Sequence, residues 1–160
     1  MKNKIGLYIH IPFCRRICNY CDFYKKVSSK QNQIKYVDYL IKDLMLNIKP
    51  YKTIYIGGGT PSSLSVKDLK YLFEIVGKFD LVEDAEFTFE CNLNDINEDL
   101  LNILKENGVN RLSIGIESFN EEKLKFMERF HTYEEAENSI NLARNLGFNN
   151  INVDLMYGIP

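Results

Sequence analysis

Hydrophobic and polar residues alternate with two different periods in successive segments of this chain. One pattern has the period of two that is typical of β-strands, and it covers residues 5–11, 53–56, 85–91, 111–117 and 151–156. The other has helical spacing, and it covers residues 31–48, the segment after Ser65, a segment around 100–104, a short stretch at 121–128 and a longer one at 133–147. Strands that alternate with helices predict right-handed crossovers and a parallel sheet. We therefore expect an α/β fold of about five βα units.

The helices carry their own boundary signals. Two helix starts have the spacing of an N-terminal cap: Ser65 with Asp68, and Thr132 with Glu135. Helix ends are marked by Gly147 and by Asn107-Gly108. In residues 31–48 the apolar residues that recur on one face are Ile34, Val37, Ile41, Leu44 and Ile48. We expect that face to be buried.

The predicted strands are amphipathic rather than apolar throughout. A sheet covered by helices on both faces reads as near-continuous apolar runs, whereas Ile151, Val153 and Leu155 alternate with polar residues. The strongest polar residues fall late in their strands, namely His10, Glu90, Glu117 and Asp154. Functional groups of β/α barrels lie at the carboxyl ends of the strands. We expect the apolar face of each strand to be buried against helices. We expect the polar face to form a binding site inside a barrel-like sheet; an open sheet with one solvated face is the alternative.

Composition narrows the class of protein. The chain has 160 residues, a net charge of −2, 45% hydrophobic and 26% charged residues, as one globular domain does. The near-neutral balance gives no basic stripe for nucleic acid. No apolar run is long enough for a membrane span, and residues 1–4 do not start a signal peptide. We therefore expect a cytoplasmic protein.

Three of the four cysteines, Cys14, Cys18 and Cys21, lie within eight residues, directly after the first strand. In a reducing compartment such a cluster indicates metal binding or catalysis. The spacing also suits small hydrophobic residues on one helical face, or a structural zinc site, although zinc ligands usually come in pairs. Three thiolates can instead hold three corners of an iron–sulfur cube and leave the fourth iron open. The sequence favours this third interpretation.

Four segments together resemble the radical S-adenosylmethionine (SAM) superfamily. They are 8–23, 57–62, 110–119 and 154–160, and they occur in the order typical of the branch that contains oxygen-independent coproporphyrinogen III oxidase and the HemW-type heme chaperones. The resemblance implies a partial (β/α)6 barrel of the TIM type, with residues 1–160 as the N-terminal portion of the core domain. A sixth strand and a C-terminal domain would then be absent, which would leave an unpaired strand edge.

The resemblance also implies a set of site residues. Cys14, Cys18 and Cys21 would hold a [4Fe–4S] cluster, and Tyr8 would lie beside it. The residues at SAM-contacting positions are Gly58, Gly59, Thr60, Glu90, Glu117, Arg129 and Asp154. Carboxylates can accept hydrogen bonds from the ammonium and ribose hydroxyls of SAM, and Arg129 could pair bidentately with its carboxylate. We interpret His10 as a satisfied interior histidine, His131 as a loop residue and Cys91 as a packed thiol.

The chain departs from the family pattern at informative positions. Phe23 stands where the oxidase has a further cysteine, which favours a heme chaperone. Glu117 replaces a usual glutamine, and Glu128 replaces a frequent glycine. The alternatives are the oxidase itself, which decarboxylates coproporphyrinogen III through a 5′-deoxyadenosyl radical, and a structural zinc domain. Implied partners are heme or a porphyrinogen and an electron donor such as flavodoxin or ferredoxin.

Overall fold

The structure is a computed structural model that describes residues 5–159. Residues 1–4 and Pro160 lie outside this range. The expectation about a signal peptide at residues 1–4 and the last residue of segment 154–160 therefore fall outside the described residues. The strands are β1 (Gly6–Ile11), β2 (Tyr51–Gly58), β3 (Leu81–Asn92), β4 (Arg111–Glu117) and β5 (Asn150–Leu155). The helices are α1 (Lys30–Met45), α2 (Val66–Val76), α3 (Glu98–Glu106), α4 (Glu121–Phe126) and α5 (Tyr133–Asn145). Two short 3₁₀ turns, η1 (Pro61–Ser63) and η2 (Leu93–Asp95), follow β2 and β3.

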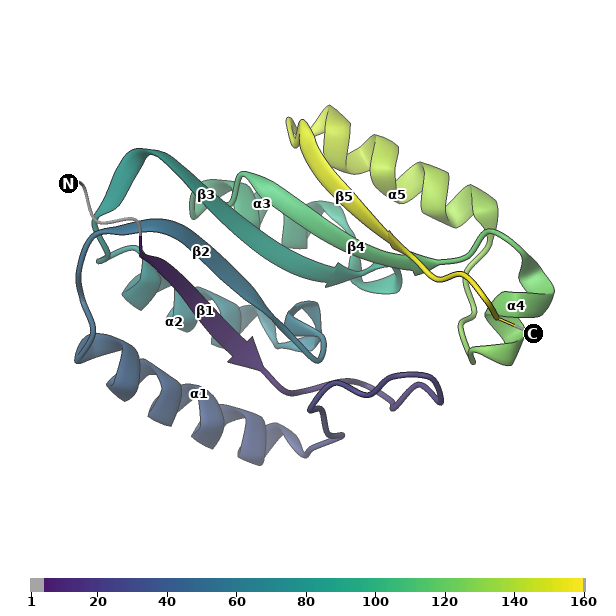
Figure 1. The fold of residues 1–160 in the computed structure, drawn as a ribbon. Coiled ribbons are helices and arrows are strands. Elements are labelled where there is room, and N and C mark those ends of the chain that lie inside the picture. Colours follow the sequence, from purple (N-terminus) through teal and green to yellow (C-terminus); the bar gives the residue numbers. More distant parts are fainter. Residues whose placement is uncertain (1–4, 160) are drawn as a thin grey trace.

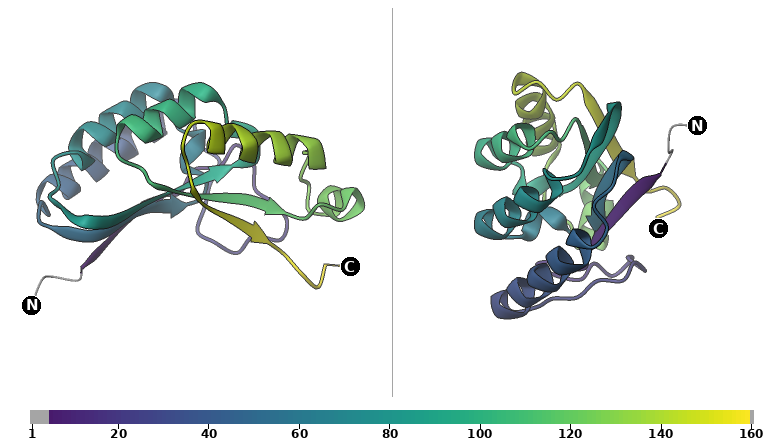
Figure 2. Two further views of the ribbon diagram at one scale, coloured as in Figure 1. Left: turned by 90° about the horizontal axis from the view of Figure 1, so that it is seen from above. Right: turned by 90° about the vertical axis from the view of Figure 1, so that its left-hand side faces the viewer.

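All five strands form one parallel sheet in the order β1-β2-β3-β4-β5, so each strand pairs with the next one along the chain (Figure 1). The sheet is curved, and the helices cover one of its faces (Figure 2). The expected parallel α/β arrangement is confirmed. Sequential parallel strands with helices on one side form the wall of a partial barrel.

The alternating pattern of the strands decides which side chains meet the helices. Ile54, Ile56, Leu112 and Ile114 are fully buried under the helices, and the residues between them face the open side. The capping signals are confirmed as well: the Ser65 hydroxyl accepts from the Asp68 N–H, and Thr132 forms a complete capping box. No helix within residues 5–159 is long and apolar enough to cross a membrane.

Two expectations about burial are wrong. Ile34 and Ile48 are 45% and 47% exposed, because α1 ends at Met45 and only its middle turns pack on the sheet. Val153 and Leu155 are 36% and 57% exposed, because β5 is an edge strand. The helix before β5 reaches Ile151 but does not cover the rest of the strand.

Candidate functional site

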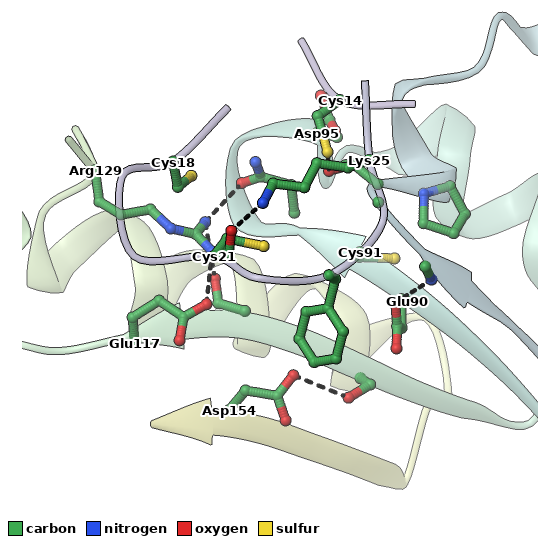
Figure 3. A pocket seen from close by; sticks show the side chains of 18 of the residues that line it. Cys14, Cys18, Cys21, Lys25, Glu90, Cys91, Asp95, Glu117, Arg129 and Asp154 are labelled. Carbon is green, nitrogen blue, oxygen red and sulfur yellow. Dashed lines mark hydrogen bonds and ion pairs between the residues drawn. The ribbon is translucent and has the colours of Figure 1, made fainter. Parts of the chain in front are cut away.

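A cavity of about 910 Å³ lies at the carboxyl ends of the strands, under the loop that follows β1 (Figure 3). We call residues 12–29 the cysteine loop. All eleven site residues expected from the sequence line this cavity: Tyr8, Cys14, Cys18, Cys21, Gly58, Gly59, Thr60, Glu90, Glu117, Arg129 and Asp154. The parallel topology explains the convergence, since every strand delivers its last residues to the same edge of the sheet.

Backbone hydrogen bonds connect the start of the cysteine loop to its own end and to Thr60, shortly after β2. The Cys14 N–H donates to the Lys26 carbonyl at 3.1 Å, and the Lys26 N–H donates to the Pro12 carbonyl at 2.7 Å. The Thr60 N–H donates to the carbonyl of Phe13 at 2.7 Å. The first cysteine is therefore held in place by main-chain contacts.

Side chains fasten the middle of the loop to the far side of the cavity. Arg15 forms an ion pair with the buried Asp95 in η2, at 2.8 Å. The Asn19 amide donates to the carbonyl of Phe126, the last residue of α4, at 2.8 Å. These contacts hold the loop over the cavity without using any thiol.

The cysteine thiols are half-buried and unpaired with one another. Burial raises the pKa of the Cys14 thiol, and the Thr60 hydroxyl donates a hydrogen bond to its sulfur at 3.3 Å. Gly59 has to be a glycine, because a Cβ there would lie 2.9 Å from the main chain of Phe13 and Pro12 and 3.0 Å from the Cys14 sulfur. The loop and Gly59 thus fit together around this thiol.

The three thiols of the cysteine loop are donors of the kind that iron–sulfur clusters use. Cys14, Cys18 and Cys21 line one cavity, and the other two thiols contribute to the raised pKa of Cys14. Within residues 5–159, no group of three or more His, Cys, Asp or Glu side chains is placed to hold one metal ion. The chemistry of the three donors therefore fits a [4Fe–4S] cluster.

Glu90, at the end of β3, has both carboxylate oxygens held by β2. The Tyr55 hydroxyl donates to Oε1 at 2.5 Å, and the Gly58 N–H donates to Oε2 at 2.9 Å. Gly58 has a φ of 120°, which only glycine adopts readily and which turns its N–H towards the carboxylate. The carboxylate is therefore fixed at the cavity wall with lone pairs left for a ligand.

Arg129 is engaged on all sides by the protein. Its Nη2 lies 2.6 Å from Glu117 Oε1, its Nε donates to the Tyr20 hydroxyl at 3.0 Å, and its Nη1 donates to Asn92 Oδ1 and the Gly115 carbonyl at 3.4 Å (Figure 3). Burial raises the pKa of Glu117 even though Arg129 opposes the shift. The guanidinium joins the cysteine loop to the ends of β3 and β4. From the sequence we expected Arg129 to pair with the carboxylate of SAM.

The remaining polar residues are also paired. Asp154 accepts from the Ser113 hydroxyl at 3.3 Å and from the Asn152 amide at 2.7 Å. His10 Nε2 lies 3.0 Å from the Tyr24 carbonyl, which can only accept, so Nδ1 accepts from the Tyr8 hydroxyl at 3.0 Å. His10 is thus satisfied by the protein, as expected.

His131 and Cys91 lie at the back of the site. His131 lies in the loop between α4 and α5, as expected. Its ring nevertheless packs inwards: the residue is only 4% exposed, and within residues 5–159 neither ring nitrogen has a hydrogen-bond partner. Cys91 is a buried core thiol, as expected, and burial raises its pKa.

Sequence reasoning missed Tyr55, Tyr20 and Asn92 as site residues. The signal for Tyr55 was present, because it lies between Ile54 and Ile56 and therefore points to the polar face of the sheet. Asn92 follows Glu90 by two residues and therefore lies on the same polar face of β3, so its signal was present as well. Tyr20 lies in a loop, where no periodicity reveals the direction of a side chain.

This chain is similar to proteins of known function and to a solved structure. Heme chaperone HemW of Bacillus subtilis (strain 168) is 42% identical over 96% of this chain and 42% of its own length. Oxygen-independent coproporphyrinogen III oxidase of Escherichia coli (strain K12) is 32% identical over 99% of this chain and 36% of its own. The solved structure of the Escherichia coli oxidase HemN, described as a radical SAM enzyme, superimposes with a TM-score of 0.89 over 98% of this chain and 38% of its own. The chain spans less than half the length of these relatives.

The family model described as the radical SAM superfamily matches residues 8–160, from within β1 to the end of the chain. Membership of this family implies a [4Fe–4S] cluster and SAM, and the three thiols and the carboxylates around one cavity suit both. This chain belongs to the radical SAM superfamily.

Proposed function

We propose that this chain is the cluster- and SAM-binding part of a heme chaperone of the HemW type. The observation that carries the proposal is the meeting of three thiols and the polar ends of the strands in one cavity. In this proposal Cys14, Cys18 and Cys21 hold the [4Fe–4S] cluster. When bound, the cluster and SAM supply one-electron chemistry, and an electron donor such as flavodoxin or ferredoxin would reduce the cluster.

The other site residues would position SAM. Glu90 and Asp154 have lone pairs left to accept from the ammonium and the ribose hydroxyls. Gly58, Gly59 and Thr60 would contact SAM from the part of the cavity that they line. These roles are supported by the place of the groups in the same cavity as the thiols.

The far side of the cavity supports a different kind of contact. Glu117 and Arg129 would present an existing ion pair to the amino-acid end of SAM, which carries both charges. Tyr8 would lie against the cluster side of the cavity, with its hydroxyl held by His10. The paired groups would bind the zwitterion without either charge being left unpaired.

Two observations favour a chaperone over an oxidase. Phe23, whose side chain is 75% exposed at the cavity, stands where the oxidase resemblance calls for a further cysteine. Identity to the HemW relative is 42%, against 32% to the oxidase. The oxidase remains the second candidate, supported by the TM-score of 0.89 to the HemN structure.

The two candidates make different predictions for anaerobically purified, reconstituted protein. A chaperone binds heme, seen as a shifted Soret band, and leaves coproporphyrinogen III unchanged in the presence of SAM and a reductant. An oxidase releases carbon dioxide from coproporphyrinogen III. The control replaces Cys14, Cys18 and Cys21 by alanine, which should abolish iron and sulfide. A folded parent protein without iron would refute both candidates.

A further inference from the structure

One tyrosine of the cavity, Tyr55, donates its hydroxyl hydrogen to a carboxylate of the same cavity. Tyr55 lies on the open face of β2, and its hydroxyl donates to Glu90 Oε1 at 2.5 Å. Its ring packs beside that of Tyr8, with centroids 5.9 Å apart. The side chain is therefore fixed at both its ring and its hydroxyl.

The glycine that follows makes room for this contact. A Cβ at Gly57 would lie 2.6 Å from the Glu90 carboxyl carbon and 2.6 Å from the Tyr55 ring. Any other residue at position 57 would push the phenol and the carboxylate apart. The contact between Tyr55 and Glu90 therefore depends on a glycine at position 57.

Glu90 is held by two donors from the same neighbouring strand. Tyr55 binds one oxygen, and the Gly58 N–H binds the other at 2.9 Å. With both oxygens tethered, the carboxylate cannot rotate about its last bond without losing a hydrogen bond. A group fixed in its binding orientation before the ligand arrives loses less entropy on binding.

The chemistry of the phenol suits a permanent donor. Burial, followed by the interaction with Glu90, raises the pKa of Tyr55. The hydroxyl keeps its proton at neutral pH, and a carboxylate accepts from it without competition. Each carboxylate oxygen still has a lone pair free for a donor in the cavity.

We propose that Tyr55 is a positioning residue that sets the SAM affinity of the site by holding the Glu90 carboxylate in place. The proposal rests on the function proposed above, in which Glu90 contacts SAM. Tyr55 itself touches neither SAM nor the cluster. It acts through Glu90 alone.

The test is a double-mutant cycle on SAM binding, measured by calorimetry on anaerobically reconstituted protein. Tyr55→Phe removes a single oxygen atom and keeps the ring. We expect it to weaken SAM binding about tenfold, as expected for a lost hydrogen bond to a charged group. Iron and sulfide content should stay the same. In the Glu90→Ala background, which leaves the Tyr55 hydroxyl without its acceptor, Tyr55→Phe should have little further effect.

Tyr51→Phe is the matched control. Tyr51 lies on the same strand and donates one hydrogen bond to the Asn47 carbonyl at 2.8 Å, but it does not line the cavity. This variant should bind SAM as tightly as the parent. It separates the loss of a phenol on β2 from the loss of the Glu90 contact.

Three results would overturn the proposal. The first is a Tyr55→Phe protein that binds SAM as tightly as the parent. The second is an equal loss of SAM affinity with Glu and with Ala at position 90, which would make Tyr55 a direct ligand contact. A Tyr55→Phe protein that fails to hold iron would also contradict it, because the proposal gives Tyr55 no part in holding the cluster. A parent that holds the cluster but binds no SAM would instead refute the proposed function, and this proposal with it.

Discussion

Three helices end in the same hydrogen-bonded turn, and one of them uses an unfavourable residue. At the ends of α3 and α5 the residue after the C-cap is a glycine with positive φ, Gly108 at 82° and Gly147 at 88°. At the end of α4 this residue is Glu128, with a φ of 56°. The Glu128 N–H donates to the Lys125 carbonyl at 3.1 Å, and the next N–H donates to Leu124 at 2.8 Å, which completes a Schellman motif.

The magnitude follows from the backbone. Left-handed φ costs a residue with a Cβ about 1–2 kcal/mol, and the greater freedom of glycine in the unfolded chain returns about 0.5–1 kcal/mol of this. Glu128 is exposed, so little packing is lost with its side chain. We therefore expect Glu128→Gly to raise the free energy of unfolding by about 0.5–1 kcal/mol.

Urea unfolding followed by circular dichroism measures the change, and two variants serve as controls. Glu128→Gln keeps the Cβ and removes the charge, so it isolates the repulsion between a carboxylate and the helix C-terminus. Gly108→Ala is the reverse experiment, because a Cβ there would meet no atom within 4 Å, and only the backbone cost remains. It should lower the free energy of unfolding by about 1 kcal/mol.

The reasoning is refuted if Glu128→Gly is neutral or destabilising while Gly108→Ala destabilises as expected. That result would mean that the Glu128 side chain makes a contribution that offsets its backbone. A gain in Glu128→Gln equal to that in Glu128→Gly would assign the effect to charge alone.

Other predictions concern the site itself. Thr60→Val removes the hydrogen bond to the Cys14 sulfur. Because such bonds stabilise a reduced cluster, the midpoint potential of the cluster in an EPR-monitored titration should become more negative. Thr60→Ser keeps a hydroxyl and should leave this potential unchanged. Burial lowers the pKa of His131 from 6.5, so its stabilising contribution is present above pH 6.5 and is lost as the pH falls. His131→Leu should therefore flatten the acid side of a plot of unfolding free energy against pH, and an unchanged slope would contradict this. Arg129→Met leaves the Glu117 carboxylate buried without its partner and should cost about 3 kcal/mol in urea unfolding, with part recovered by adding Glu117→Gln.

The fold could be predicted because its signals are local. Alternation in residues 111–117 places Leu112, Ile114 and Ile116 on one face regardless of what packs there, and the structure buries all three. The Thr132 cap is equally local, since it is satisfied within its own first turn. The convergence of the site also followed from the sequence, because parallel strands bring their carboxyl ends to one edge.

Features set by distant contacts could not be predicted. Val153 and Leu155 have a strand pattern, but their exposure depends on the place of β5 in the sheet. The inward turn of His131 depends on the path of the loop after α4. No sequence pattern records which neighbours a strand or loop will have.

Arg129 shows what this limit means for the site. A lone arginine near a cavity suggests a ligand contact, yet this guanidinium already binds Glu117 at the end of β4 and Tyr20 between two of the cysteines. A ligand that draws Glu117 or Arg129 towards itself must therefore change the hydrogen bond that Arg129 gives to the cysteine loop. Arg129 thus joins the cysteine loop to the end of β4, a connection that its position in the sequence alone does not reveal.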